Sequence, residues 1–132
     1  MAMTLREKIR WDKAATHRVL DLPPTQRALL PDVDPVEGPV DLIVGTVFTL
    51  PEFAELVSRV WNRGELNPNG VLYVLYPKKG NKVYEQWIHR DDIFPALGVS
   101  EETGFVGATR MKFNKMFAFD GTFTCIGIKY VP

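Results

Sequence analysis

The sequence has few of the residues that cross-link a chain or bind a metal ion. It contains one cysteine, Cys125, and two histidines, His17 and His89. A single cysteine cannot form an internal disulfide, and two isolated histidines have none of the spacings of a metal site. Cys125 lies in the apolar segment Thr-Phe-Thr-Cys-Ile-Gly-Ile, so we expect a buried small hydrophobic residue rather than a nucleophile. The sequence therefore predicts neither a disulfide nor a metal site.

The chain also lacks a net charge, because 16 basic side chains balance 16 acidic ones. Overall charge therefore gives no support for binding to nucleic acid or to a membrane. The charges are nevertheless distributed unevenly, with seven acids against two bases in residues 31–67 and seven bases against five acids in residues 76–115. The second segment predicts a mildly basic surface or, alternatively, an ordinary solvated face.

Long apolar runs are missing as well. No run approaches the length of a membrane span, and the charged residues Arg6, Glu7, Lys8 and Arg10 stand where a signal peptide would have its apolar core. We therefore expect a cytoplasmic protein without membrane contact. The length of 132 residues fits a single domain, which we expect to span residues 1–132, and the sequence contains no internal repeat or linker.

The middle of the chain predicts a strand, a helix and a second strand. Asp41–Phe48 is a nearly continuous apolar run, which is typical of a strand buried on both faces. Thr49 can cap a helix that has Pro51 in its first turn and Gly64 just past its end. Val71–Tyr76 is a second apolar strand. This spacing predicts a βαβ unit with parallel strands, and two doubly buried strands imply helices on both faces.

Shorter elements flank this unit. Thr4 and Glu7 match a capping box, which predicts a helix to about Lys13. The other predicted elements are a strand over His17–Leu22, a helical turn over Gln26–Leu30, a turn over Asn67–Gly70, a helix from Asp91 or Asp92 to Gly98, and antiparallel strands over Phe105–Phe119 (irregular around Asn114) and Thr122–Val131. We therefore expect an α/β fold in three layers, with about five strands in a mostly parallel sheet and a C-terminal antiparallel hairpin.

Three short segments carry a resemblance to a known family: His17-Arg18-Val19-Leu20, Asp41-Leu42-Ile43-Val44 and Tyr76-Pro77-Lys78-Lys79. From Asp41 to Val131, the order and spacing of the elements resemble the C-terminal half of a class I S-adenosylmethionine-dependent methyltransferase. With these segments, the chain is more closely similar to short bacterial proteins of unknown function that look like truncated methyltransferases. The resemblance implies a trimmed, Rossmann-like fold.

The cofactor motif of that family is missing from this sequence. The family needs a glycine-rich turn after the first strand and an acidic residue at the end of the second, as dinucleotide folds do. Here Leu22-Pro23-Pro24-Thr25-Gln26 follows the first strand, and Pro23–Pro39 leaves no room for two further strands. Asp21 and Asp34 have no strand end that would hold them as ribose ligands. We therefore expect no cofactor and no methyltransferase activity.

The strongest candidate site is the loop Tyr76–Lys82, with the sequence Tyr-Pro-Lys-Lys-Gly-Asn-Lys. It follows a predicted parallel strand, and ligands of α/β folds bind beyond the carboxyl ends of such strands. Lysine ammonium groups suit phosphate or carboxylate, and the rings of Tyr76 and Tyr84 suit stacking on a base. The alternative interpretation is a solubilising loop. The predicted anion-binding residues are Tyr76, Lys78, Lys79, Gly80 and Lys82.

Two other patterns have both a functional and a structural interpretation. His89 with Asp91 or Asp92 could form an acid–base pair. No serine or cysteine nucleophile accompanies it, so we predict a structural histidine and no catalytic residue. The segment Met111–Phe119 interleaves aromatic residues with lysines. Such interleaving is found in RNA-binding surfaces, but a strand with one buried face, or a covered protein interface, explains it equally.

The leading functional prediction is a non-enzymatic binding or regulatory domain that forms a homodimer. In the trimmed fold the strand His17–Leu22 lies at an open sheet edge, and soluble proteins block or pair such edges. Trp11, Trp61 and the Met/Phe-rich hairpin add apolar surface for an interface. The alternatives are a small enzyme or a nucleotide or anion binder that uses the Tyr76–Lys82 loop, and a weak RNA-binding module.

Overall fold

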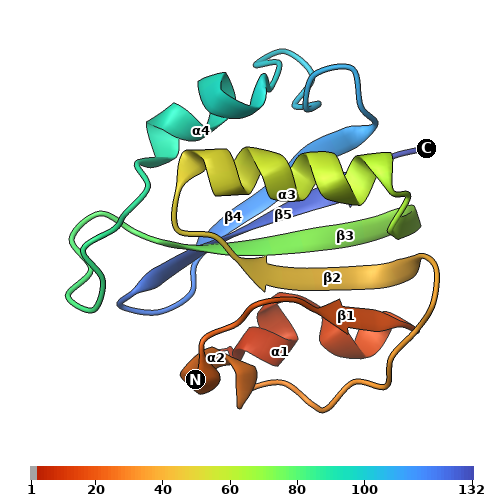
Figure 1. Ribbon diagram of the computed structural model, residues 1–132, viewed down its shortest axis with the longest axis horizontal. Coiled ribbons are helices and arrows are strands. Elements are labelled where there is room, and N and C mark those ends of the chain that lie inside the picture. Colours follow the sequence, from red (N-terminus) through yellow and green to blue (C-terminus); the bar gives the residue numbers. More distant parts are fainter. Residues whose placement is uncertain (1–2) are drawn as a thin grey trace.

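A single sheet organises the computed structural model, which describes residues 3–132 (Figure 1). Within that range the sheet has five strands in the order β1-β2-β3-β5-β4. The elements are α1 (Leu5–Lys8), the 3₁₀ helix η1 (Trp11–Lys13), β1 (His17–Val19), α2 (Pro24–Arg27), β2 (Val40–Thr46), α3 (Leu50–Asn62), β3 (Leu66–Pro77), α4 (Arg90–Leu97), β4 (Met111–Ala118) and β5 (Phe123–Tyr130).

The sheet is mixed. β1 pairs with β2 and β2 pairs with β3 in parallel, whereas β3–β5 and β4–β5 are antiparallel. The predicted α/β class, the βαβ unit and the C-terminal antiparallel hairpin are confirmed. The expectation of a mostly parallel sheet is not confirmed, because two of the four strand pairings are parallel and two, both involving β5, are antiparallel.

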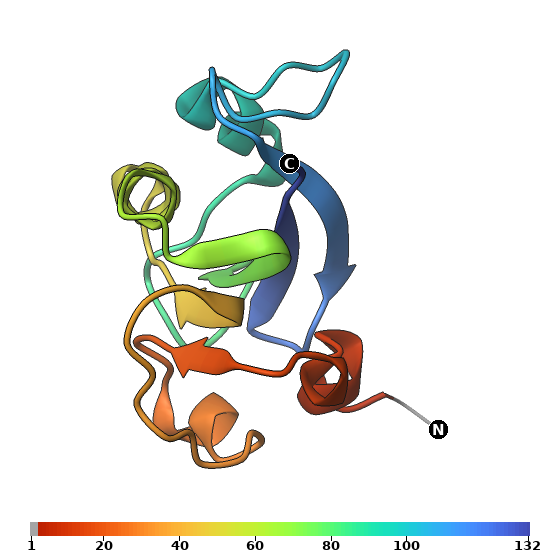
Figure 2. The ribbon, with the colours of Figure 1, turned by 90° about the vertical axis from the view of Figure 1, so that its right-hand side faces the viewer.

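Two apolar clusters lie on opposite faces of the sheet. Side chains of β2 and β3 alternate between them, so that Ile43 and Leu72 join the cluster under α3 and α4, while Leu42 and Tyr73 join the cluster that contains Leu5 of α1. Figure 2 shows α3 and α4 on one face, α1 on the other, and α2 beyond β1. Because helices cover both faces of the sheet, the sequences of β2 and β3 are almost continuously apolar.

The N-terminal helix is shorter than predicted. Thr4 and Glu7 form the expected capping box, but α1 ends at Lys8 and Arg10 adopts a left-handed conformation with a φ of 56°. The turn directs Trp11 into the core, where it is 4% exposed and stacks on His17 with ring centroids 4.0 Å apart. The prediction of one helix to Lys13 is therefore wrong. So is the expectation that Trp11 contributes apolar surface to an interface.

The segment between β1 and β2 contains no strand, which agrees with the prediction that it is too short for two further strands. β1 ends at Val19 rather than at the predicted Leu22, and the helical turn is α2, which begins at Pro24 rather than Gln26. Gln26 is buried and donates a hydrogen bond to Asp120 Oδ2 at 3.2 Å, which ties α2 to the β4–β5 turn. The elements thus shift by a few residues, and their order is as predicted.

The predicted turn at Asn67–Gly70 is wrong, because these residues belong to β3. Their register against β2 shifts between Val40 and Leu42, which is a local bulge. Asn69 supplies the left-handed residue, with a φ of 70°. The turn-forming residues therefore make an irregularity within a long strand rather than its start.

The two longer helices are capped by the side chain of the residue just before each helix. The Thr49 hydroxyl accepts a hydrogen bond from the Glu52 backbone N–H at 3.2 Å, as predicted. In α4 the cap is His89, whose Nδ1 accepts from the Asp91 N–H at 3.1 Å; the predicted start at Asp91 or Asp92 is therefore slightly late. Gly98 ends α4 with a φ of 67°.

The C-terminal hairpin is shorter on its first strand than predicted. β4 begins at Met111, because the preceding residues turn at Gly104 and Gly107, both of which have positive φ values. The expected irregularity at Asn114 is present as a register shift between Phe113 and Lys115. As a result, the odd-numbered side chains of β4 face α4 before this shift, and the even-numbered ones are on that face after it.

Candidate functional site

A pocket of about 410 Å³ opens between the end of β3, the start of α4 and the second half of β4. Its place matches the expectation for an α/β fold, in which ligand sites lie beyond the carboxyl ends of parallel strands. The volume lies in the usual range for small-molecule sites. The residues that line it are Tyr76, Lys78, Lys79, Ile88, His89, Arg90, Met116, Phe117, Ala118 and Thr124.

The connection from β3 to α4 brings two separate stretches of chain to this pocket. Lys78 and Ile88 form a parallel bridge, and the Ile88 N–H donates to the Pro77 carbonyl at 2.9 Å. The bridge closes the intervening residues into a loop, and Gly80 turns it with a φ of 84°. Lys78 and Lys79, at one end of the loop, thereby lie beside His89 and Arg90, at the other.

Asn81 holds the inside of this loop. Its Oδ1 accepts hydrogen bonds from the N–H groups of Val83 and Tyr84 at 3.1 and 2.7 Å. Its Nδ2 donates to the carbonyls of Lys78 and Gln86 at 3.0 and 3.1 Å. Because one side chain provides hydrogen-bond partners for four backbone groups, the loop is held in one conformation although it contains no helix or strand.

Three cationic side chains border the pocket, and no carboxylate lines it within residues 3–132. They are Lys78, Lys79 and Arg90, and His89 adds an imidazole. Arg90 Nε lies 3.7 Å from Asp91 Oδ1, but both side chains are exposed, so this contact is weak and leaves the guanidinium available. The arrangement favours an anion.

The amides at the start of α4 contribute little to such an anion site. The Asp91 N–H donates to His89 Nδ1, and the Asp92 N–H donates to the His89 carbonyl at 3.0 Å. His89 Nδ1 caps the helix by accepting this bond, so this nitrogen is not available to a ligand. The predicted structural role of His89 is thus visible in its hydrogen bonds, and an anion in the pocket would depend on side-chain cations.

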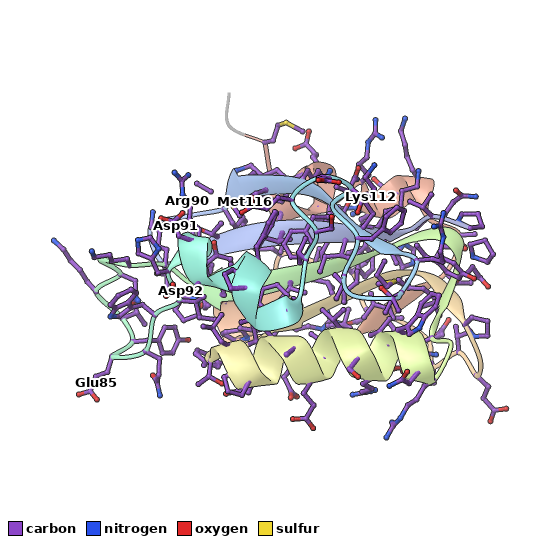
Figure 3. All side chains as sticks on the ribbon, turned by 90° about the horizontal axis from the view of Figure 1, so that it is seen from above. Glu85, Arg90, Asp91, Asp92, Lys112 and Met116 are labelled. Carbon is purple, nitrogen blue, oxygen red and sulfur yellow. The ribbon has the colours of Figure 1, made fainter. Side chains whose placement is uncertain are left out.

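The floor of the pocket combines a buried phenol with an apolar wall. Burial raises the pKa of Tyr76 above its ordinary value, an effect that a hydrogen bond with Thr124 partly opposes, so its hydroxyl remains protonated. Met116 is 42% exposed on β4. Figure 3 labels Met116, Arg90 and Asp91, with Arg90 and Asp91 at the start of α4 and Met116 on the strand beside it. A ligand would meet charge on one side and apolar surface on another.

An exposed indole stands at the rim. Trp87 is 47% exposed, the Lys79 Nζ lies 5.7 Å from its ring centroid, and the His89 ring lies 6.4 Å away. Both of these neighbours line the pocket. Trp87 therefore borders the site through two of its lining residues.

The five predicted site residues divide into two groups. Tyr76, Lys78 and Lys79 line the pocket, whereas Gly80 and Lys82 do not. Tyr84, expected to stack on a ligand, instead packs between Phe48 and Phe123, with centroid distances of 5.0 and 5.7 Å. The lining residues that sequence reasoning missed are Ile88, Arg90, Met116, Phe117, Ala118 and Thr124.

A smaller pocket of about 230 Å³ lies at the carboxyl ends of β1 and β2. Asp21, considered above as a ribose ligand, lines it together with Glu52, Glu55 and Arg59. Three acids against one base make this surface unsuitable for an anion. The two pockets therefore differ in the charge of ligand they favour.

The apolar residues of β4, and Phe119 just after it, are used mainly in packing. Met111 is buried, and Phe113, Phe117 and Phe119 pack against one or other of the two apolar clusters. Lys115 is engaged too, since its Nζ donates to the Lys8 carbonyl at 2.9 Å. The alternation of β4 thus has a structural explanation, while RNA binding stays a prediction.

Within residues 3–132, neither the free cysteine nor a cluster of metal-ligating side chains gives a second candidate site. Cys125 is buried as predicted, and burial raises the pKa of its thiol, which keeps it protonated. The described part of the chain has no group of three or more histidine, cysteine or acidic side chains placed to hold a metal ion. Among the same residues, no helix is long and apolar enough to cross a membrane.

Fold and pocket together define an α/β protein with an open five-stranded mixed sheet and a basic, partly apolar pocket beside β3 and β4. The chain matches no protein-family model and no curated protein sequence. The assignment of a function therefore starts from the pocket itself.

Proposed function

We propose that the protein is a non-enzymatic binding domain whose pocket takes a small anionic ligand. The observation that carries the proposal is the convergence of Lys78, Lys79 and Arg90 on one pocket without a carboxylate in its lining. Each cation is accessible to water, so its contribution is screened and an affinity in the micromolar range or weaker is expected. Binding should weaken as ionic strength rises.

A titration with inorganic phosphate, followed by calorimetry, tests this proposal. Lys78→Ala/Lys79→Ala should lower the affinity about tenfold or more, because hydrogen bonds to charged groups contribute roughly 1.5–3 kcal/mol. Lys82→Ala is the matched control, since Lys82 belongs to the same loop but does not line the pocket. Equal effects of the two changes would reduce the loop to a solubilising surface.

We also propose that the fold is a trimmed, three-layer methyltransferase-like arrangement. The sheet order supports it, because the doubly wound order 3-2-1-4-5-6 without its second and third strands leaves the first strand at an edge beside the fourth and fifth. β1 lies at such an edge, next to β2 and β3. In this proposal the relatives are short bacterial proteins, the location is the cytoplasm and no S-adenosylmethionine is bound.

The proposed partner is a second copy of the chain, joined at the β1 edge. A groove of about 350 Å³ runs beside this strand, between His17–Val19 and Val33–Val36. Two exposed apolar side chains lie in the segment that follows β1: Leu29 is 46% exposed and Val36 is 36% exposed. An enzyme that uses the basic pocket, and an RNA-binding module, remain the alternative proposals.

A further inference from the structure

We propose that the ligand of the basic pocket is a nucleotide, with its phosphate at Lys78, Lys79 and Arg90 and its base against the Met116 wall. This inference rests on the proposed anion site and adds the chemistry of the rest of the ligand. A free mononucleotide and one unit of a single-stranded RNA share that chemistry.

The apolar wall is the first argument. α4 covers the first half of β4, where Phe94 meets Phe113 with ring centroids 4.9 Å apart. Beyond the bulge at Asn114 the cover ends, and Met116 and Ala118 are exposed beside the cationic side chains. A thioether beside an open apolar surface suits an aromatic ring, because sulfur and aromatic rings attract each other. Inorganic phosphate or a sugar phosphate would leave this wall unused.

The polar groups on the pocket floor are the second argument. The Tyr76 hydroxyl remains protonated and shares a hydrogen bond with the Thr124 hydroxyl, which leaves the pair one donor and further acceptor positions; both residues line the pocket. A hydroxyl can donate and accept hydrogen bonds, which matches the mixed donors and acceptors at the edge of a base or on a ribose. The pocket thus offers cations for a phosphate, an apolar wall for a ring and hydroxyls for polar edges.

Trp87 provides the readout. The Lys79 ammonium lies over its ring, and a phosphate that draws Lys79 into the pocket would change the surroundings of the indole. Of the other two tryptophans, Trp11 is buried against His17 and Trp61 packs on Tyr130 with centroids 5.4 Å apart. His17 and Tyr130 do not line the pocket, whereas Lys79 and His89 beside Trp87 do, so a fluorescence change on binding should be lost in Trp87→Phe.

The test compares AMP, GMP, CMP and UMP with ribose 5-phosphate and inorganic phosphate, by calorimetry and by Trp87 fluorescence. At least one mononucleotide should bind about tenfold or more tightly than ribose 5-phosphate. Met116→Gln should remove most of that advantage while leaving the affinity for inorganic phosphate unchanged. Lys78→Ala/Lys79→Ala should weaken all the phosphate compounds, and circular dichroism should show both variants folded.

The outcomes separate the two proposals. If every phosphate compound binds equally and Met116→Gln has no effect, the anion site stands and the nucleotide inference is overturned. If no phosphate compound binds the wild-type protein, both proposals fail. A single-stranded oligoribonucleotide that binds more tightly than every mononucleotide would support the site and identify RNA as the source of the nucleotide.

Discussion

The side-chain oxygen of Asn81 accepts a hydrogen bond from the backbone nitrogen of Tyr84 at 2.7 Å, and this is one of four bonds by which Asn81 ties the β3–α4 loop together. Asn81→Ala should destabilise the protein by about 1–3 kcal/mol, because several backbone groups lose their partner at once. Urea unfolding measures the loss. Asn81→Asp keeps the acceptor and loses the donor, so its stability should lie between those of the wild type and Asn81→Ala. An unchanged urea midpoint in Asn81→Ala would show that other contacts fix the loop.

Gly70 lies in the β3 bulge with no room for a side chain. A Cβ there would lie 2.8 Å from the Asn67 carbonyl oxygen and 3.0 Å from that of Asp41, both of which are backbone atoms. Gly70→Ala should therefore cost about 1–3 kcal/mol of unfolding free energy. Gly121→Ala is the matched control, since a Cβ at Gly121 meets nothing within 4 Å. Similar melting temperatures for the two variants would contradict the bulge geometry.

Asp41 links stability to acid pH. A hydrogen bond from Asn67 holds the pKa of its carboxyl below the ordinary 3.8; partial burial opposes this effect, and Thr16 adds a further hydrogen bond. Because the folded pKa is lower than the unfolded one, the stabilisation is present above pH 3.8 and is lost as the pH falls through the folded pKa. Asn67→Ala should raise the Asp41 pKa towards 3.8, which carboxyl NMR titration measures. An unaltered titration would mean that the hydrogen bonds from Thr16 and from the Ala15 backbone set the pKa without Asn67.

S-adenosylmethionine should not bind this protein in a specific way. The segment after β1 turns through Leu22, Pro23 and Pro24 instead of a glycine-rich turn, and only α2 lies between β1 and β2 in the described chain. Calorimetry should give no dissociation constant below about 100 μM, which corresponds to roughly 5.5 kcal/mol of binding free energy. A tighter, saturable signal would overturn this expectation.

The dimer proposal predicts a mass near twice the 15.0 kDa of one chain when light scattering is measured at micromolar concentration. Val36→Lys, at the groove beside β1, should shift the population towards the monomer, because a charge would enter the apolar part of the interface. Met116→Lys, on the opposite edge strand, is the control. A monomeric wild-type protein would show that the 33–36 segment and α2 are enough to protect the β1 edge.

Local patterns in the sequence were sufficient for much of the fold. The Thr4 capping box, the Thr49 cap and Gly98 act within one or two helical turns, so they can be predicted from neighbours in the chain. The apolar runs of β2 and β3 predict burial on both faces because α3, α4 and α1 cover both. Errors occurred where distant packing overrode a local signal, as when Trp11 entered the core and ended the N-terminal helix early.

The candidate pocket could be predicted only in part. Lys78 and Lys79 were found because they follow a buried strand directly, at the edge where parallel strands end. Arg90 and Met116 lie 11 and 37 residues beyond Lys79 in the sequence, and no periodicity connects them to the lysines.

The sequence by itself determined the α/β class, the βαβ unit, the terminal hairpin and a basic loop, since these depend on spacing and residue type. Only the tertiary structure decided which residues share the pocket. The Lys78–Ile88 bridge brings Arg90 back to the lysines, and the antiparallel pairing through β5 places Met116 opposite Ile126, beyond the part of β4 that α4 covers. Those contacts join segments far apart in the chain, and their positions follow from how the whole sheet packs rather than from any local pattern.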